Sequence, residues 1–166
     1  NKFNDEAKKW SQIGRSQLEK SVKKLVMKDG SFTQQSLTYH RFVLDTLSQV
    51  EILRRHLNLK PMSNEYSTKF ALLIKWLYFF VDSVSGDGPN LGGNDGSFCF
   101  QLHDLSSRDF RPTLQLSSVL ENSFKNSLYD NGRWNEPLIW LDLEKKSFKK
   151  FPLLRSKVFP NGGYIN

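Results

Sequence analysis

The 166-residue sequence predicts an all-α fold built from antiparallel pairs of helices. Two observations support this class. Apolar residues recur at helical spacing in successive segments joined by short polar turns, and no convincing strand-like alternation occurs before about residue 147. With 38% hydrophobic residues, the chain is apolar enough and long enough to bury a sizeable core. Such a succession of helices is compatible with a helical toroid or a solenoid-like stack.

Two long amphipathic helices are predicted over residues 5–27 and 36–57, separated by the turn pair Asp29-Gly30. In the first, the apolar positions at helical spacing are Trp10, Ile13, Leu18, Val22, Leu25 and Val26. The second carries an apolar stripe made of Tyr39, Phe42, Val43, Leu47, Val50, Leu53 and Leu57. Glu51 and Arg55 form a favourable i,i+4 pair on this second helix.

A third helix is predicted over residues 64–83, with Ser63 as its N-cap. From Phe70 to Val81 it is apolar almost all round, so we expect it to be buried on most sides. This stretch carries Lys75 and is roughly half as long as a membrane-spanning helix, so no membrane span is predicted.

The remaining third of the chain is less regular. A long polar loop is predicted at residues 85–95, and five of the ten glycines cluster around it. A fourth helix is predicted over residues 112–124 and a short one over 136–143, followed by an extended or irregular tail. We expect the chain to be an excised portion of a longer protein, because it begins without methionine and ends in a glycine-containing segment typical of a hairpin or strand.

The charge of the chain favours an anionic partner. The formal net charge is +7 and the pI is near 9.5, which leaves nucleic acid, an acidic polysaccharide or an anionic membrane surface open. A basic protein with no charged ligand is an equal alternative. Nucleic acid is not the expected partner, because the basic residues are spread over several helices without a platform of stacked aromatic residues.

No metal or cofactor is expected from the sequence. His40, His56, His103 and Cys99 show no metal-ligand spacing. The glycine-rich loop lacks both the dinucleotide fingerprint and the P-loop lysine. The single cysteine, Cys99, excludes an internal disulfide framework, and its aromatic neighbours on both sides predict an inert, buried thiol.

The densest group of chemically active side chains lies at the start of the second helix, between Gln34 and Arg41. Near a helix N-terminus His40 is expected to keep a neutral ring that can accept a proton, and Tyr39 and His40 can project into a cleft. Gln34 or Gln35 can donate to a carboxylate, and Arg41 can pair with one. The structural alternative remains open: Tyr39 in the core, His40 on the surface and the glutamines as turn residues.

Two further clusters are candidates for ligand binding. Asn90, Asn94 and Asp95 lie on the glycine-rich loop, where glycines allow close approach of the backbone to a ligand. Arg108 and Arg111 precede the fourth helix and can bind a carboxylate or sulfate. Local pairing of Asp109 with one of these arginines, which would fix the loop, is at least as good an interpretation.

The order of these segments resembles the heparinase II/III-like polysaccharide lyase family. The segments that carry the resemblance are Trp10 to Gly14, Asp29 to Ser36, Tyr39 to Arg41, Pro89 to Gly96, Arg108 to Pro112 and Phe159 to Tyr164. The resemblance implies that residues 1–146 are the later helices of an α/α toroid. It also implies that residues 147–166 are a linker and the first strand of a β-sandwich domain that this chain lacks.

The resemblance further implies cleavage of uronic-acid-containing glycans by β-elimination, without a cofactor. His40 or Tyr39 is then the base or acid and Gln35 neutralises the substrate carboxylate. Substrate is held by Gln34, Arg41, Asn90, Asn94, Asp95, Arg108 and Arg111. The family's β domain also contributes a histidine to the cleft, so the fragment alone is expected to be inactive. A periplasmic or secreted location is implied. The alternative is a non-catalytic module that binds acidic glycans or is associated with capsule or exopolysaccharide.

Overall fold

The computed structural model describes residues 2–99, 101–121, 127–144 and 156–165, and it confirms the all-α class. The helices in these ranges are α1 Lys2–Leu25, α2 Leu37–His56, α3 Asn64–Phe80, α4 Arg111–Leu120 and α5 Glu136–Trp140. A short 3-10 turn, η1 (Arg133–Asn135), leads into α5. The strands β1 (Val158–Phe159) and β2 (Tyr164–Ile165) pair antiparallel, with Val158 opposite Ile165 and Phe159 opposite Tyr164.

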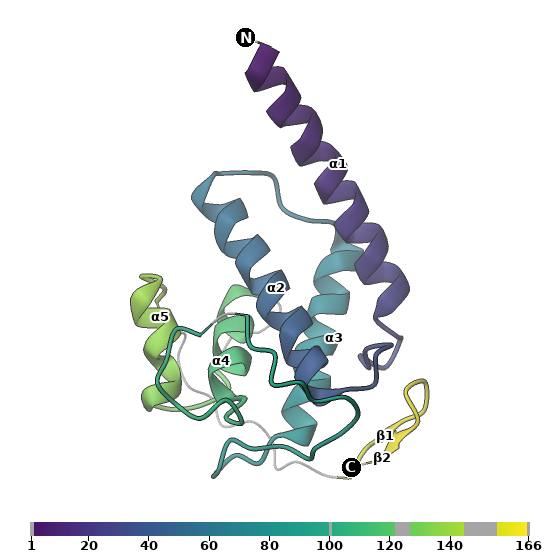
Figure 1. Ribbon diagram of the computed structural model, residues 1–166, viewed down its shortest axis with the longest axis vertical. Helices are drawn as coiled ribbons and strands as arrows, with labels where there is room; N and C mark the ends of the chain where they lie inside the picture. Colours follow the sequence, from purple (N-terminus) through teal and green to yellow (C-terminus); the bar gives the residue numbers. More distant parts are fainter. Residues whose placement is uncertain (1, 100, 122–126, 145–155, 166) are drawn as a thin grey trace.

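The helices surround α3, which contacts α1, α2 and α4 (Figure 1). The N-terminal half of α1 projects beyond the other helices, whereas its C-terminal half lies along α3. Helix α4 packs on α2 and α3, and α5 packs on the outer side of α4. The C-terminal hairpin lies near the turn that joins α1 to α2. No helix in the described ranges is long and apolar enough to cross a membrane.

The core is built around α3, as its apolar sequence predicts. Its buried residues are Tyr66, Phe70, Leu73, Ile74, Trp76, Leu77 and Phe80, whereas Lys75 is exposed. Ser63 caps the helix, since its hydroxyl accepts a hydrogen bond from the amide of Tyr66 at 3.3 Å. The hairpin adds two rings to this core: the centroid of Trp76 lies 6.1 Å from that of Phe159 and 5.1 Å from that of Tyr164.

The apolar stripe predicted for α2 is only partly in the core. Leu47 is buried, but Phe42, Leu53 and Leu57 are 42%, 59% and 60% exposed. The face of α2 that packs against its neighbours includes the polar residues Thr38, His40, Arg41, Asp45, Ser48 and Glu51. The reason is that α4 also presents polar groups to α2. Buried hydrogen bonds join the hydroxyls of Ser48 and Ser117 at 3.0 Å and connect Thr113 to Asp45 at 2.8 Å.

The apolar positions of α1 divide in the same way. Val22 is buried where the helix lies along α3, as is Val26 just after the helix, whereas Trp10 is 70% exposed on the projecting half. The predicted pair of Glu51 and Arg55 is present at 3.9 Å, although Arg54 lies closer to Glu51, at 2.8 Å. The fourth helix ends at Leu120, and residues 122–124 of its predicted range lie outside the described residues.

The prediction of a buried Cys99 is wrong, because its side chain is exposed. The neighbouring Phe98 ring packs over the guanidinium of Arg41, whose central carbon lies 4.3 Å from the ring centroid. The thiol retains distant contacts, 4.0 Å from the carbonyl oxygen of Phe42 and from a carboxylate oxygen of Asp45.

The turn between α1 and α2 also anchors the hairpin, through the carboxylate of Asp29. This carboxylate accepts hydrogen bonds from the amide and hydroxyl of Ser31 at 3.1 and 2.6 Å. Its other oxygen accepts from the amides of Asn161 and Gly162 at 2.7 and 3.1 Å. Partial burial raises the pKa of Asp29, but these hydrogen bonds outweigh burial, so the pKa lies below its ordinary value.

Gly30 is required at this turn for two reasons. Its φ of +92° is rarely adopted by other residues, and a Cβ there would lie 2.3 Å from the carbonyl oxygen of Leu72. Gly96 has a similar φ of +73° but no atom within 4 Å of the Cβ position. Replacing Gly96 therefore introduces backbone strain alone, whereas replacing Gly30 introduces the same strain together with steric overlap.

We expect Gly96→Ala to lower the free energy of unfolding by about 1–2 kcal/mol, the strain of a left-handed residue. Gly30→Ala should lower it by at least about 2 kcal/mol more, because the Leu72 carbonyl must also move. Urea unfolding followed by circular dichroism measures both variants. Equal losses would show that the contact between Gly30 and α3 contributes nothing.

Candidate functional site

The N-terminus of α2 meets the glycine-rich loop, so two of the three predicted clusters lie side by side. The amide of Leu37 donates to the carbonyl of Leu91 at 3.2 Å, and the hydroxyl of Ser36 donates to the carbonyl of Gly93. The same Ser36 hydroxyl caps α2 by accepting from the amide of Tyr39 at 3.2 Å. One serine thus starts the helix and holds the loop against it.

A glycine at position 92 permits this close approach. Gly92 has a φ of +67°, and a Cβ there would lie 2.1 Å from the carbonyl oxygen of Gln35. Gln35 itself has a φ of +50°, which is uncommon for a residue with a side chain. Both Gln34 and Gln35 are exposed at this junction.

Side chains complete the contact between helix and loop. The hydroxyl of Thr38 donates to the side-chain oxygen of Asn94 at 3.1 Å, and the amide group of Asn94 donates to Asn90 at 2.9 Å. The phenol of Tyr39 donates to the carboxylate of Asp95 at 2.7 Å. Three of the predicted loop residues are therefore connected to the first turn of α2, directly or through one another.

The hydrogen bond between Tyr39 and Asp95 fixes the protonation of both groups. Hydrogen bonds from Ser97 and Tyr39 lower the pKa of Asp95 to about 2. The bond to Asp95 and its negative charge raise the pKa of the Tyr39 phenol. At neutral pH the site therefore presents an ionised carboxylate and a protonated, half-buried phenol.

Tyr39 also lines an apolar groove of about 290 Å³ between α1 and α2. Gln34 lies on the same groove, whose walls are mostly apolar side chains such as Leu18, Phe32 and Phe42. The phenol of Tyr39 is thus a polar group at the edge of an apolar surface. This arrangement is common in small-molecule sites, where a few polar groups orient a ligand against an apolar wall.

His40 lies in the core and not in a cleft at the start of the helix. It is 1% exposed, its ring stacks on Trp76 with centroids 4.3 Å apart, and its Nε2 donates to the carbonyl of Leu73 at 2.9 Å. Burial lowers its pKa to about 4, although the bond to Leu73 opposes this change. The ring is neutral, as predicted from the helix terminus, but the dominant cause is burial.

Arg41 is also buried, at 2% exposure. Its guanidinium donates to the carbonyls of Ser97, at 3.1 Å, and Ser107. It lies over the rings of Phe98 and Phe110, 4.3 and 5.0 Å from their centroids. This arginine therefore connects α2 to both ends of the 97–107 segment, and its donors are directed at the protein backbone.

The two predicted arginines, Arg108 before α4 and Arg111 at its first position, are paired locally. Arg111 forms a buried ion pair with Asp109 at 2.6 Å, donates to the carbonyl of Val84 at 2.8 Å and lies over the Trp134 ring at 4.2 Å. The hydrogen bond to Asp109 raises the pKa of Arg111. Arg108 pairs with Asp87 at 2.5 Å. The structure therefore agrees with the interpretation that Asp109 pairs locally with one of these arginines.

The exposed part of the predicted cluster is thus smaller than the sequence suggests. Its exposed or half-buried members at the junction of α2 and the loop are Gln34, Gln35, Tyr39, Asn90, Asn94 and Asp95, whereas the half-buried Arg108 is paired with Asp87. These groups offer amide donors, one phenol and one carboxylate. No group of three or more potential metal-ligating side chains occurs in the described parts of the chain.

Comparison with known proteins bears on the same segment. The family described as heparinase II/III N-terminus matches residues 3–82. This part of the chain, just under half of its length, is heparinase II/III-like. The match spans α1 from its second residue, all of α2 and α3, and the two residues after α3, and so includes the predicted residues from Gln34 to Arg41. The glycine-rich loop lies beyond the matched range. No curated protein and no solved structure gives a significant match.

Helix α2, within the matched range, holds one further ionisable group that the sequence analysis did not single out. Asp45 is 2% exposed, and Thr113 donates to it at 2.8 Å. Burial raises its pKa to about 7, with Thr113 and the charge of Arg41 acting in the opposite direction. The i,i+4 spacing of Arg41 and Asp45 is the signal that could have identified it, since both lie on one face of α2.

Asp45 should make stability depend on pH. Its pKa is higher in the folded than in the unfolded chain, so its favourable contribution is complete below about pH 4 and is lost as the pH rises to about 7. Relative to Asp45→Asn, the wild type should lose about 2–4 kcal/mol of unfolding free energy between pH 4 and pH 8.

Chemical unfolding of both proteins across this pH range measures the difference. Asp5→Asn on the exposed start of α1 is the control for removing one carboxylate. Parallel pH profiles for the wild type and Asp45→Asn would contradict the assignment.

Proposed function

We propose that this chain is part of a polysaccharide lyase that cleaves uronic-acid-containing glycans by β-elimination. The observation that carries the proposal is the protonated phenol of Tyr39, held by Asp95 beside the exposed amides of Gln35 and the glycine-rich loop. The match to the heparinase II/III N-terminus supports the same class. The proposal includes an α/α toroid over residues 1–146 and a β-sandwich domain that begins within residues 147–166.

The exposed amides suit the first step of this reaction. The hydrogen at C5 of a uronate is a poor acid until the negative charge of the neighbouring carboxylate is offset. Gln35, with Gln34 and Asn94 beside it, can donate hydrogen bonds to that carboxylate without bringing a full charge. Such bonds strengthen as charge builds up on the enolate-like intermediate, so they lower the barrier to removal of the proton.

We assign Tyr39 to the second step, as the acid. The C4–O bond breaks while a C4=C5 double bond forms, and the phenol proton passes to the leaving oxygen. The phenol is protonated at neutral pH, and its O–H turns from Asp95 to the leaving oxygen for the transfer. Transfer is still favourable, because a departing sugar alkoxide is a stronger base than a phenolate.

The base is assigned to a group outside this cluster. Because the ring of His40 is buried against Trp76, we propose that His40 positions the first turn of α2 and does not accept the C5 proton. The resemblance to the family implies a histidine from the β domain at the cleft, and that residue is the candidate base. Arg41, Arg108 and Arg111 are assigned to holding the loop segments, since the guanidinium group of each already bonds to the protein.

A non-catalytic module that binds acidic glycans is the second candidate. The burial of His40 and Arg41 favours this second candidate. With these two side chains buried, Tyr39 is the one ring among the exposed or half-buried members of the cluster that can donate a proton. The two candidates make the same prediction for binding and opposite predictions for the unsaturated product.

In the full-length protein, Tyr39→Phe should reduce kcat on a uronic polysaccharide by about 10²–10⁴-fold, the usual contribution of a general acid. Ultraviolet absorbance of the conjugated uronate product measures turnover. Tyr129→Phe is the matched control, because its hydroxyl is buried, has no hydrogen-bond partner among the described residues and lies outside the cluster.

Two results would count against this assignment. Unchanged turnover in Tyr39→Phe would remove Tyr39 from the chemistry. Binding of uronic glycans by the wild type without any unsaturated product would favour the non-catalytic module.

A further inference from the structure

One side of α1 is exposed along most of its length. Positions spaced alternately by three and four residues share one side of a helix, and this spacing is typical of a helix that packs against a second helix. On α1 these positions are Ala7, Trp10, Gly14, Gln17 and Ser21, and all five are exposed. We call them the exposed face of α1.

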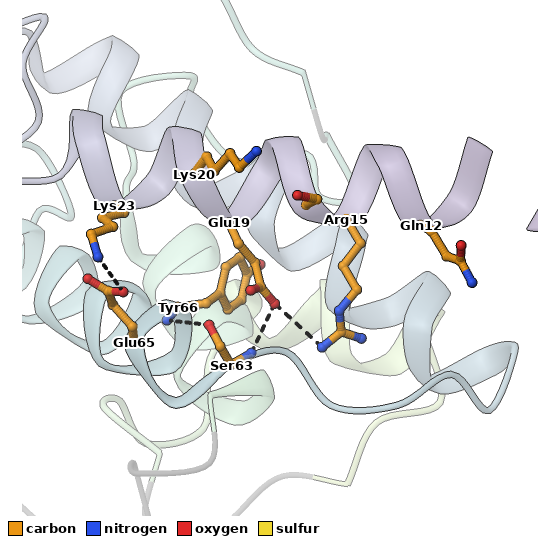
Figure 2. A pocket seen from close by; sticks show the side chains of 9 residues that line it. Gln12, Arg15, Glu19, Lys20, Lys23, Ser63, Glu65 and Tyr66 are labelled. Carbon is orange, nitrogen blue, oxygen red and sulfur yellow. Dashed lines mark hydrogen bonds and ion pairs between the residues drawn. The ribbon is translucent and has the colours of Figure 1, made fainter. Parts of the chain in front are cut away.

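The opposite side of α1 is used within the chain (Figure 2). Arg15 donates to the carbonyl of Lys60 at 2.8 Å, and Glu19 accepts the amide of Ser63 at 3.0 Å, which fixes α1 on the turn before α3. The N-terminal half of α1 nevertheless projects beyond the other helices (Figure 1). A short helical segment is only marginally stable in water by itself, so we expect a partner to cover this half.

The exposed face leads into the apolar groove of about 290 Å³ between α1 and α2. Leu18, Ser21, Val22 and Leu25 form the α1 wall of this groove. Trp10 lies about three turns before the groove and is 70% exposed. The molecule therefore carries a large unburied ring and, on the same helix, a groove with room for one.

Two charges lie along one edge of the exposed face. Glu6 and Lys24 are 18 residues apart, which is about five full turns of 3.6 residues, so they project in the same direction. Among the described residues, neither side chain has an ion pair. When two helices pack antiparallel, each edge meets the same edge of the partner. Glu6 of one copy would then lie beside Lys24 of a second copy, and the two-fold axis would repeat this pair.

The charges and the groove require the same register. With Glu6 opposite Lys24, the two helices cross beside Gly14, and Trp10 faces residues 18–22 of the other copy, which belong to the groove. A Cβ at Gly14 would meet no atom within 4 Å, so no contact among the described residues requires a glycine there. At the crossing point, its missing side chain lets the two backbones approach closely.

We propose that two copies of this chain associate through α1, antiparallel about a two-fold axis beside Gly14. Trp10 of each copy occupies the groove of the other, and Glu6 pairs with Lys24 at both ends of the contact. A second copy is favoured over an unrelated partner, because the ring, the groove and both charges lie on one helix and complement one another after a two-fold rotation. The inference does not depend on the proposed function.

Sedimentation equilibrium of the full-length protein measures the association. The wild type should have twice the mass of one chain, and Trp10→Ala should weaken association at least about a hundredfold, because each dimer contains this contact twice. Trp140→Ala is the matched control, since Trp140 is 74% exposed on α5, outside the groove. It should leave the association unchanged.

Charge reversal tests the register. Glu6→Lys and Lys24→Glu should each weaken association about tenfold, because each places like charges together at both ends of the contact. The double variant Glu6→Lys/Lys24→Glu restores opposite charges and should recover most of the affinity. Asp5→Lys, which changes the net charge as Glu6→Lys does but lies on the opposite side of α1, should have little effect.

Cross-linking locates the axis. In a Cys99→Ser background, Gln17→Cys places one thiol on the exposed face next to the crossing point, and a short bismaleimide should join two copies. Ser16→Cys is the matched control, because this exposed neighbour points away from the exposed face and should cross-link far more slowly.

Three results would overturn the inference. A full-length protein that stays monomeric up to about 100 µM would assign the groove to another segment of the same protein or leave it open. Equal cross-linking of Gln17→Cys and Ser16→Cys would move the contact away from the exposed face. Failure of the double charge reversal to recover affinity would refute the antiparallel register.

Discussion

The buried guanidinium of Arg41 is the interaction on which the candidate site depends. It reaches from the second turn of α2 to the carbonyls of Ser97 and Ser107, and the rings of Phe98 and Phe110 lie against it. Burial lowers the pKa of this arginine, so the carbonyls and rings must compensate for its lost hydration. Through this contact the loop after α3 is fixed on the helix, and the residues it carries are held in place.

One turn of α2 serves both structure and the proposed chemistry. Consecutive residues of a helix point about 100° apart, so neighbours such as Tyr39 and His40 face different surroundings. The ring of His40 stacks on Trp76 in the core, whereas the phenol of Tyr39 meets Asp95 near the surface. The segment thus buries its imidazole and its guanidinium and leaves its phenol and amides at the surface. This division is the physical reason for assigning Tyr39 as an acid and His40 as a positioning residue.

The sequence predicted the elements with a clear local cause. The apolar run of α3, the cap at Ser63 and the turn at Gly30 all have the predicted structure. The inner face of α2 could not be predicted in this way, because the polar pairs Ser48–Ser117 and Asp45–Thr113 are satisfied only across helices far apart in sequence. The contact between Tyr39 and Asp95 is equally non-local, so the sequence could suggest it only through its resemblance to a family.

The central claim is that an acidic glycan binds where the Tyr39 phenol meets the glycine-rich loop. The most direct measurement is carbon NMR of the full-length protein labelled at the tyrosine ζ carbon, titrated with a uronic tetrasaccharide. The Tyr39 resonance should shift as the saccharide saturates the protein, whereas that of the buried Tyr129 should not. Saturation of the protein with no change at Tyr39 would contradict the claim.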